Sequence, residues 1–212
     1  MSQPLVIIGC GGFGREVFGI VEALNAQAAA FDVIGFVDDR PSSAGLERVA
    51  GLGSAVVGTV ASLASWPEPV SAVIAIGSPA ARAAVDAALA SSQVTWATLV
   101  HPQASVGPQV TVGPGAVVCA GARLSANISV GRHVHVDQNA TVGHDSRIGD
   151  FARLNPQACV SGSVTVGAQA TIGASATVLQ GLVVAAGATV GAGAVVTRDV
   201  PEAAVVKGVP AR

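Results

Sequence analysis

Residues 100–196 read VHPQASVGPQVTVGPGAVVCAGARLSANISVGRHVHVDQNATVGHDSRIGDFARLNPQACVSGSVTVGAQATIGASATVLQGLVVAAGATVGAGAVV, and one six-residue pattern repeats through them without a break. An aliphatic residue, the anchor of each unit, stands at every sixth position, seventeen times in succession. The anchors are Val100, Val106, Val112, Val118, Leu124, Val130, Val136, Val142, Ile148, Leu154, Val160, Val166, Ile172, Val178, Val184, Val190 and Val196. A glycine often follows the anchor directly, and a small residue often stands four positions after it, as at Gly113 and Ala116. A period of six fits neither a free-standing helix nor a hairpin array and is typical of a parallel β-helix.

The repeat also predicts the geometry of each coil. One unit supplies a short strand and a corner, and three units close a triangular coil of eighteen residues. The branched anchor fills the inside of the prism, and the small residue lets the chain turn without crowding it. Successive coils pair at the parallel-strand spacing of about 4.8 Å. Residues that are eighteen positions apart should therefore stack in columns.

Length and composition bound the rest of the fold. A chain of 212 residues suggests one large or two small domains, and the start of the repeat divides it into residues 1–99 and 100–212. Charged residues make up 11% of the chain and aromatic residues 3%, as a narrow prism packed with Val and Ala requires. We therefore predict an α/β, Rossmann-like half-domain followed by an all-β, parallel β-helix.

Charge and hydropathy exclude several classes of protein. No continuous apolar run reaches 18 residues, and no basic stretch precedes a cleavable apolar one, so we expect no membrane partner and a cytoplasmic location. A net charge of −2 without a basic cluster argues against a nucleic-acid partner. Cys10, Cys119 and Cys159 are too scattered for a metal site and predict free thiols.

The N-terminal residues show the pattern strand, Gly-rich turn, helix. An apolar strand at 5–8 leads into Gly9–Gly14, which has the spacing G-x-G-x-x-G, and a helical pattern follows at 15–25. Further strands are expected at 32–37, 55–57 and 72–76, and a helix at 80–89, after which residues 94–100 lead into the repeat. Glycines in such a turn let a phosphate approach the amides at the helix N-terminus, and an acidic residue after the second strand can meet a ribose hydroxyl. The residues assigned to substrate binding on this basis are Gly11, Gly12, Phe13, Gly14, Asp38, Asp39 and Gly77.

Three interpretations of this turn remain open. A full dinucleotide domain needs two βαβαβ halves, and about 95 residues hold little more than one. The available length therefore favours a single nucleotide, or a sugar attached to one, over NAD(P). The third interpretation is that the glycines only pack the helix against the strand.

The whole chain resembles bacterial sugar acyltransferases of the sialic acid O-acetyltransferase and nucleotide-aminosugar N-acetyltransferase family. The resemblance is carried by the Gly-rich opening, the His101-Pro102 junction, the uninterrupted repeat and the closing residues Gly208–Ala211. It implies a left-handed β-helix, a homotrimer, acetyl-CoA bound between neighbouring helices without a metal, and an N-terminal domain that holds the nucleotide of the acceptor. Gly143-His144-Asp145 matches the family's G-H-[DE] step, in which the histidine is the general base and the carboxylate orients it.

Three features depart from the pattern of the relatives. Arg153 stands where several relatives carry a second histidine near the thioester, and Asp137 stands where an asparagine often occurs. By these matches Arg153 is assigned to acetyl-CoA binding and Asp137 to substrate binding. The turn reads Gly-Phe-Gly-Arg-Glu where many sugar-nucleotide enzymes carry His-Ala-Lys, which bears on the choice of acceptor.

Four histidines are candidates for acid–base or metal chemistry. His101 precedes a proline at the domain junction, which favours a structural role. His133 and His135 alternate beside Asp137, a pattern that fits zinc but fits a polar outer face of the β-helix more simply. Together with His144 they would suggest a carbonic anhydrase of the same fold. Those enzymes place two histidines five residues apart, and no pair here has that spacing.

His144 has the strongest case for catalysis. It stands two positions after an anchor and beside Asp145, and a neutral imidazole accepts a proton at cytosolic pH. One coil later in the same column stands Gly162, whose N–H has no side chain to block a ligand and can polarise a thioester carbonyl. The small residues Gly173 and Ala174 and the later coils would receive the rest of acetyl-CoA.

These residues predict acetyl-CoA-dependent acetylation of an amino or hydroxyl group of a sugar, with a nucleotide-linked sugar favoured. The alternative is a non-catalytic β-helix scaffold whose N-terminal domain senses a nucleotide. We also expect outer faces of Val, Ala and Gly with few charges. Such faces mark an interface, and the resemblance makes that interface threefold.

Overall fold

The structure is a computed structural model that describes residues 2–212, and it divides into two compact units at the peptide between Leu99 and Val100. The first unit mixes helices with a parallel sheet, and the second consists of short strands alone. Among residues 2–212, no helix combines the length and the apolar character that crossing a bilayer requires.

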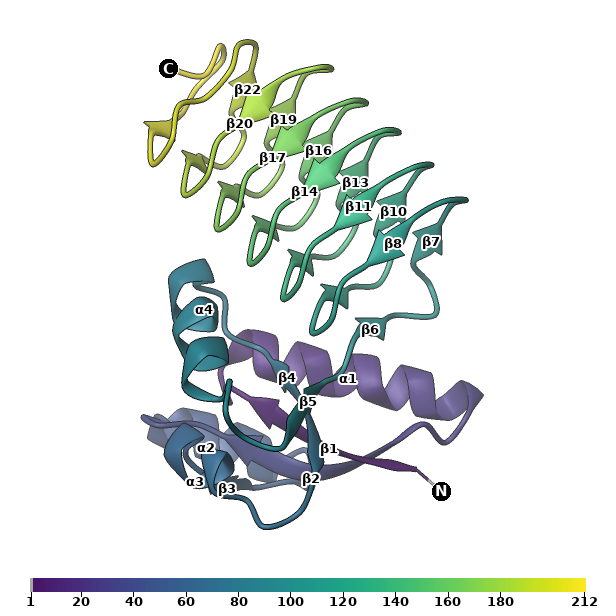
Figure 1. Ribbon diagram of the computed structural model, residues 1–212, viewed down its shortest axis with the longest axis vertical. Coiled ribbons are helices and arrows are strands. Elements are labelled where there is room, and N and C mark those ends of the chain that lie inside the picture. The colour runs from purple at the N-terminus through teal and green to yellow at the C-terminus, as the bar shows by residue number, and fades with distance from the viewer. Residues whose placement is uncertain (1) are drawn as a thin grey trace. The chain divides into compact units, whose positions relative to one another are not determined.

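The N-terminal unit is a five-stranded parallel sheet with four helices. Its elements are β1 (Gln3–Ile8), α1 (Gly12–Gln27), β2 (Phe31–Val37), α2 (Ser43–Ala50), β3 (Val56–Gly58), α3 (Val60–Ala64), β4 (Val70–Ile74), α4 (Pro79–Ala88) and β5 (Val94–Trp96). The strand order is β3-β2-β1-β4-β5, as can be followed in Figure 1. The chain winds outward through β2 and β3 and then crosses to the other side of β1. Doubly wound sheets bind ligands at the carboxyl ends of the strands, beside such a reversal.

Local sequence explains most of these elements. All five residues of β4 are buried, as expected for a central parallel strand that is covered on both faces. The four predicted strands and the two predicted helices are present, with small shifts at their ends, and β5 forms within the segment that leads into the repeat. The structure adds α2 and α3, which the sequence did not predict. The main sequence features that mark these short helices are their N-terminal caps. Ser42 caps α2, and Thr59 forms a capping box with Ser62 at α3.

The C-terminal unit is a left-handed parallel β-helix whose coils repeat every eighteen residues. Its face I holds β7 (Ser105–Val106), β10 (Arg123–Leu124), β13 (Thr141–Val142), β16 (Cys159–Val160), β19 (Thr177–Val178) and β22 (Val195–Val196). Face II holds β8 (Thr111–Val112), β11 (Ser129–Val130), β14 (Arg147–Ile148), β17 (Thr165–Val166) and β20 (Val183–Val184). Face III holds β6 (Leu99–Val100), β9 (Val117–Val118), β12 (His135–Val136), β15 (Arg153–Leu154), β18 (Thr171–Ile172), β21 (Thr189–Val190) and β23 (Val205–Val206). Figure 1 shows these strands stacked in parallel rungs.

The interior of the prism is built as the repeat predicts. Every anchor from Val118 to Val196 is buried, and so is every alanine at the fourth position after an anchor from Ala116 to Ala194. The third position after the anchor forms the turn of each corner, with a φ between 51° and 76° from Gln109 to Gly193. Only a few residue types adopt this left-handed conformation readily. Corner positions are accordingly rich in Gly, Asn, Asp and Gln.

The outer faces differ from the expected surface of Val, Ala and Gly. On faces I and II the residue before each anchor points outward. These residues are Ser105, Arg123, Thr141, Cys159, Thr177, Val195, Thr111, Ser129, Arg147, Thr165 and Val183. Threonine is the commonest of these residues, at four of the eleven positions, because a β-branched side chain suits a pleated surface and its hydroxyl remains hydrated. The prediction of apolar outer faces was therefore wrong, although the prediction of a low charge density holds.

Candidate active site

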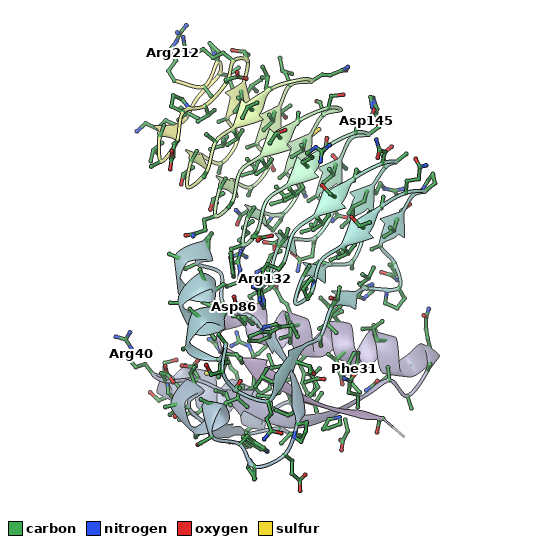
Figure 2. The ribbon with its side chains drawn as sticks, in the orientation of Figure 1. Phe31, Arg40, Asp86, Arg132, Asp145 and Arg212 are labelled. Atoms are coloured by element: carbon green, nitrogen blue, oxygen red, sulfur yellow. The ribbon has the colours of Figure 1, made fainter. Side chains whose placement is uncertain are left out.

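The His144–Asp145 pair lies at the corner between faces I and II, directly after β13. The two side chains are 54% and 51% exposed, and His144 Nδ1 lies 2.7 Å from Asp145 Oδ2. Figure 2 shows Asp145 projecting outward from the side of the β-helix. Because a carboxylate only accepts hydrogen bonds, we assign the proton of the neutral imidazole to Nδ1. The Nε2 atom is then the acceptor that can take a proton from a substrate.

Asn127 completes this arrangement from the preceding coil. Its Nδ2 donates a hydrogen bond of 2.7 Å to Asp145 Oδ1, so the carboxylate is held from both sides. These hydrogen bonds lower the pKa of Asp145 from its ordinary value, the bond from Asn127 first and that with His144 second. The sequence interpretation missed Asn127. Its signal is the eighteen-residue separation from Asp145, which places both residues in one column of corner positions with left-handed φ.

Gly162 lies next to the imidazole, one coil later. A Cβ atom built on Gly162 would be 2.6 Å from His144 Nε2, so any side chain would displace the imidazole. This confirms that residues 144 and 162 stack. The second position after an anchor is Pro, Ala, Arg, Gln, His or Asp at every other corner from Pro102 to Ala192. Gly162 is thus the one glycine in that position, and it lies beside the candidate base.

The N–H of Gly162 is available to a ligand. Among residues 2–212, no group accepts a hydrogen bond from this N–H. The same position is proline at Pro102, Pro108, Pro114 and Pro156, which shows that the coil does not need an N–H there. A donor beside Nε2 that the fold leaves unused can stabilise the oxyanion of an acyl transfer.

Asp137 and Arg153 lie elsewhere in the coil. Arg153 Nε and Nη2 both donate to Asp137 Oδ2, at 3.0 and 2.8 Å, and Asp137 is only 1% exposed. Asp137 follows β12 at the corner between faces III and I, and Arg153 lies in β15 on face III. Within one chain, therefore, this ion pair does not share a corner with His144. Gly173 and Ala174 belong to the same corner column as Asp137, two coils later.

The remaining histidines do not lie on a polar outer face as expected. His133 and His135 are fully buried. His133 stacks on Phe151 with ring centroids 5.3 Å apart, and a Cβ on Gly115 would be 2.4 Å from its Nδ1. His133 is thus one layer of a packed column. Across residues 2–212, no group of three or more His, Cys, Asp or Glu side chains is placed to bind a metal ion.

In the N-terminal unit, the glycines of the turn have two different environments. A Cβ on Gly14 would lie 1.9 Å from the carbonyl oxygen of Gly9, so Gly14 allows α1 to pack against the end of β1. A Cβ on Gly11 or Gly12 would meet no heavy atom within 4 Å. Packing therefore explains Gly14, and Gly9 is required by its φ of 106° and by contacts of 3.0 Å that a Cβ would make. The open space at Gly11 and Gly12 is where a ligand can approach α1. Phe13 is partly buried in the first turn of α1.

The two aspartates after β2 accept hydrogen bonds from backbone N–H groups of neighbouring segments. Asp38 accepts hydrogen bonds of 2.9 Å from the Cys10 and Arg40 N–H groups, and Asp39 accepts one of 2.7 Å from the Val60 N–H at the start of α3. Desolvation opposes ionisation of Asp38, but the backbone donors prevail and lower its pKa. Burial and the neighbouring Asp38 raise the pKa of Cys10 to about 11. Asp38 is therefore an anion and Cys10 a neutral thiol at neutral pH.

Two pockets open at the carboxyl edge of this sheet. One, of about 290 Å³, is lined by Gly9, Asp38, Asp39 and Ile76 among others, and Gly77 lies beside it, its carbonyl accepting a hydrogen bond of 3.0 Å from the buried Arg82. The other, of about 380 Å³, is lined by Cys10, Gly11, Gly12, Arg15, Asp38, Arg40, Ser42, Gly45 and Arg48. Of the predicted residues, Gly11, Gly12 and Asp38 thus meet in one pocket. Its three arginines were missed, because they are spread over 34 residues of sequence; Figure 2 shows Arg40 extending outward.

Comparison with known proteins gives a consistent result. Residues 4–88 match the family described as PglD N-terminal domain. PerB from Caulobacter crescentus, solved with CoA and GDP-perosamine, is 32% identical with a TM-score of 0.89, over 99% of this chain and 96% of that one. The acetyltransferase domain of PglB from Neisseria gonorrhoeae, solved with acetyl coenzyme A, is 32% identical with a TM-score of 0.86, over 100% and 99%. WeeI from Acinetobacter baumannii is 28% identical with a TM-score of 0.87, over 100% and 99%. Among curated proteins, no sequence match was found.

Proposed function

This chain belongs to the bacterial sugar acetyltransferases of the left-handed β-helix type, which use acetyl-CoA, and we propose that its acceptor is the amino group of a nucleotide-linked sugar. Its relative PerB was solved with a nucleotide-linked amino sugar, GDP-perosamine. The observation that carries the catalytic assignment is the contact between His144 Nε2 and Gly162, with Asp145 and Asn127 behind the imidazole.

The chemistry follows from this arrangement. The amine nitrogen attacks the thioester carbonyl, a C–N bond forms, and His144 Nε2 takes a proton from that nitrogen. The Gly162 N–H stabilises the oxyanion, and the imidazolium is stabilised by the carboxylate of Asp145. The C–S bond then breaks, and the sulfur of coenzyme A leaves with the proton that His144 returns. The products are an acetamido sugar and free coenzyme A.

The binding roles follow the two units. Gly11, Gly12, Phe13 and Gly14 would hold the phosphates of the acceptor with the arginine-lined pocket, and Asp38, Asp39 and Gly77 would line the nucleoside. This assignment is supported by the open space at Gly11 and Gly12 and by the placement of both pockets at the carboxyl edge of the sheet.

The remaining site residues support a homotrimer. Asp137 is assigned to the acceptor, and Arg153, Gly173 and Ala174 to acetyl-CoA, yet all four lie on face III or at its corner with face I. A neighbouring subunit that presents this side to the corner of His144 would bring the two sets together. Acetyl-CoA would then lie between two β-helices. We also propose a cytoplasmic location, because acetyl-CoA is a cytoplasmic metabolite.

One assay distinguishes this proposal from the alternative of a non-catalytic scaffold. Thiol release from acetyl-CoA is measured with GDP-, UDP- and dTDP-linked amino sugars and with matched sugars that carry a hydroxyl in place of the amine. The proposal expects release that depends on an amino sugar. Release with the hydroxyl sugars alone would replace N-acetylation by O-acetylation, and binding of a nucleotide without any thiol release would favour the scaffold.

A further inference from the structure

The corner of His144 contains a buried hydroxyl that the proposed reaction does not use. The fourth position after the anchor is Ala, Val, Ile or Leu at every corner from Ala104 to Ala194 except one, where it is Ser146. This side chain is 1% exposed and lies inside the prism. A buried hydroxyl costs free energy unless it is hydrogen-bonded. A polar exception to an otherwise strict apolar column therefore indicates a specific role.

The partners of Ser146 lie at both ends of the Gly162 corner. Its Oγ donates a hydrogen bond of 3.2 Å to the carbonyl oxygen of Ser161 and accepts one of 3.2 Å from the N–H of Val164. The carbonyl oxygen of His144 lies 3.4 Å from the same hydroxyl. One side chain thus contacts the backbone of the base and the backbone on both sides of Gly162.

Comparison with other corners shows what this hydroxyl changes. Where the fourth position is alanine, its N–H bonds directly to the carbonyl three residues earlier, as from Ala158 to Asn155 at 3.0 Å and from Ala176 to Gly173 at 3.1 Å. At the Gly162 corner, the hydroxyl of Ser146 occupies the place between the equivalent N–H and carbonyl. Among residues 2–212, the corners of Val134 and Leu182 also lack the direct bond, so a larger apolar residue at the fourth position is enough to open a corner. The hydroxyl of Ser146 bridges the two sides of the open Gly162 corner and joins it to the preceding coil.

We propose that Ser146 is a positioning residue, which sets the direction of the Gly162 N–H relative to Nε2 of His144. The inference rests on the proposed function, in which the thioester carbonyl must meet the N–H while the amine meets Nε2. These two groups belong to different coils, and a small misplacement between them lowers the rate strongly. Ser146 makes no contact with substrate in this account and acts only through the backbone of the Gly162 corner.

The test compares Ser146→Ala with Ser146→Thr and with a control, Val134→Ala. In Ser146→Ala the Val164 N–H and the Ser161 carbonyl lose the hydroxyl that bridges them, so the Gly162 peptide is no longer held in one direction. We expect kcat to fall about tenfold with both KM values within about threefold, because the loss is confined to the transition state. Ser146→Thr keeps the hydroxyl and should restore kcat to within about threefold. Val134→Ala removes buried methyl groups at the same position of another corner, so it should lower the melting temperature and leave kcat within about twofold.

Other results would overturn the inference. It is wrong if Ser146→Ala keeps kcat within twofold of the unmodified protein. It is also wrong if Ser146→Ala and Val134→Ala lower kcat equally, or if threonine is no better than alanine, because the hydroxyl would then serve packing alone. His144→Asn is measured in the same assay. If His144→Asn retains turnover, the proposed function fails. If His144→Asn loses turnover while Ser146→Ala stays fully active, only the role of Ser146 is rejected.

Discussion

Two corners of one β-helix place charged side chains in opposite surroundings. At the corner between faces I and II, His144 and Asp145 are half-exposed and joined along a column to Asn127. At the corner between faces III and I, Asp137 is buried and held by two hydrogen bonds from Arg153. The backbone repeat is the same at both. The difference shows that an open, hydrogen-bonded pair is suited to meet a substrate, whereas a closed pair adds rigidity to the coil.

The largest expected effect is a loss of stability when the buried pair of Asp137 and Arg153 is broken. Asp137→Ala removes the carboxylate that Arg153 contacts, and breaking a buried ion pair typically costs about 3 kcal/mol because one charge is left without compensation. We expect a clear drop in the midpoint of thermal and denaturant unfolding. Asp145→Asn, which removes the charge of an exposed carboxylate and keeps a residue type that tolerates the left-handed φ of 61°, is the control and should leave the midpoint almost unchanged. Equal shifts in the two variants would remove the distinction between the corners.

The Gly-rich turn offers the same contrast between open and packed positions. Gly11→Val places a side chain in open space, where it should obstruct a phosphate and raise the KM for the acceptor by at least about tenfold, with unchanged acetyl-CoA affinity. Gly19→Val, at an open position within α1, controls for the addition of the same exposed side chain to this part of the domain. A loss of acetyl-CoA affinity in Gly11→Val alone would show that the two ligands have been assigned to the wrong units.

Asp145→Asn tests the open corner directly. The amide keeps the shape of the carboxylate but loses the charge that stabilises the imidazolium, so kcat should fall about tenfold without a change in the melting temperature. Steady-state kinetics over both substrates provide the measurement. Full activity in Asp145→Asn would mean that the carboxylate does not assist His144.

The smallest effect concerns Asn127. Asn127→Ala removes the first cause of the lowered pKa of Asp145, so that pKa should rise towards its ordinary value, and kcat should fall about threefold as the imidazole loses orientation. The carboxyl pKa can be followed by carbon NMR. Asn139→Ala changes the same residue type at another corner position with a similar φ, 58° against 55°, and should change neither quantity. If the two variants behave alike, the hydrogen bond from Asn127 is not part of the site.

The sequence was sufficient to place His144 next to Gly162, but not to identify the residues that hold them in position. The strict anchors fix the coil register, so the stacking of Gly162 on His144 could be predicted and is present. Asn127 and Ser146 could not be identified in the same way, because a hydrogen bond between coils depends on where corner side chains point. A polar residue at the otherwise apolar fourth position of a corner would identify residues like Ser146 in other β-helices. Two polar residues eighteen positions apart at the left-handed position would identify pairs like Asn127 and Asp145.

Burial and local capping explain what the sequence did not predict. His133 and His135 share the alternation of a polar face but are packed, and the pairing of Asp137 with Arg153 links residues that had been given separate roles. Two short helices, α2 and α3, were missed because a capping serine or threonine was their main signal. The assignment of acceptor and coenzyme residues stays a prediction.

The most direct test of the central claim is the turnover of His144→Asn. Asparagine keeps polarity and approximate size but has no basic nitrogen, and a positioned base contributes about 10²–10⁴-fold to such a step. We predict that turnover falls by at least about a hundredfold while acetyl-CoA affinity stays within a few fold, since a base that acts in the transition state adds little to ground-state binding. Turnover equal to that of the unmodified protein between pH 6 and 9 would contradict the account and place the base elsewhere.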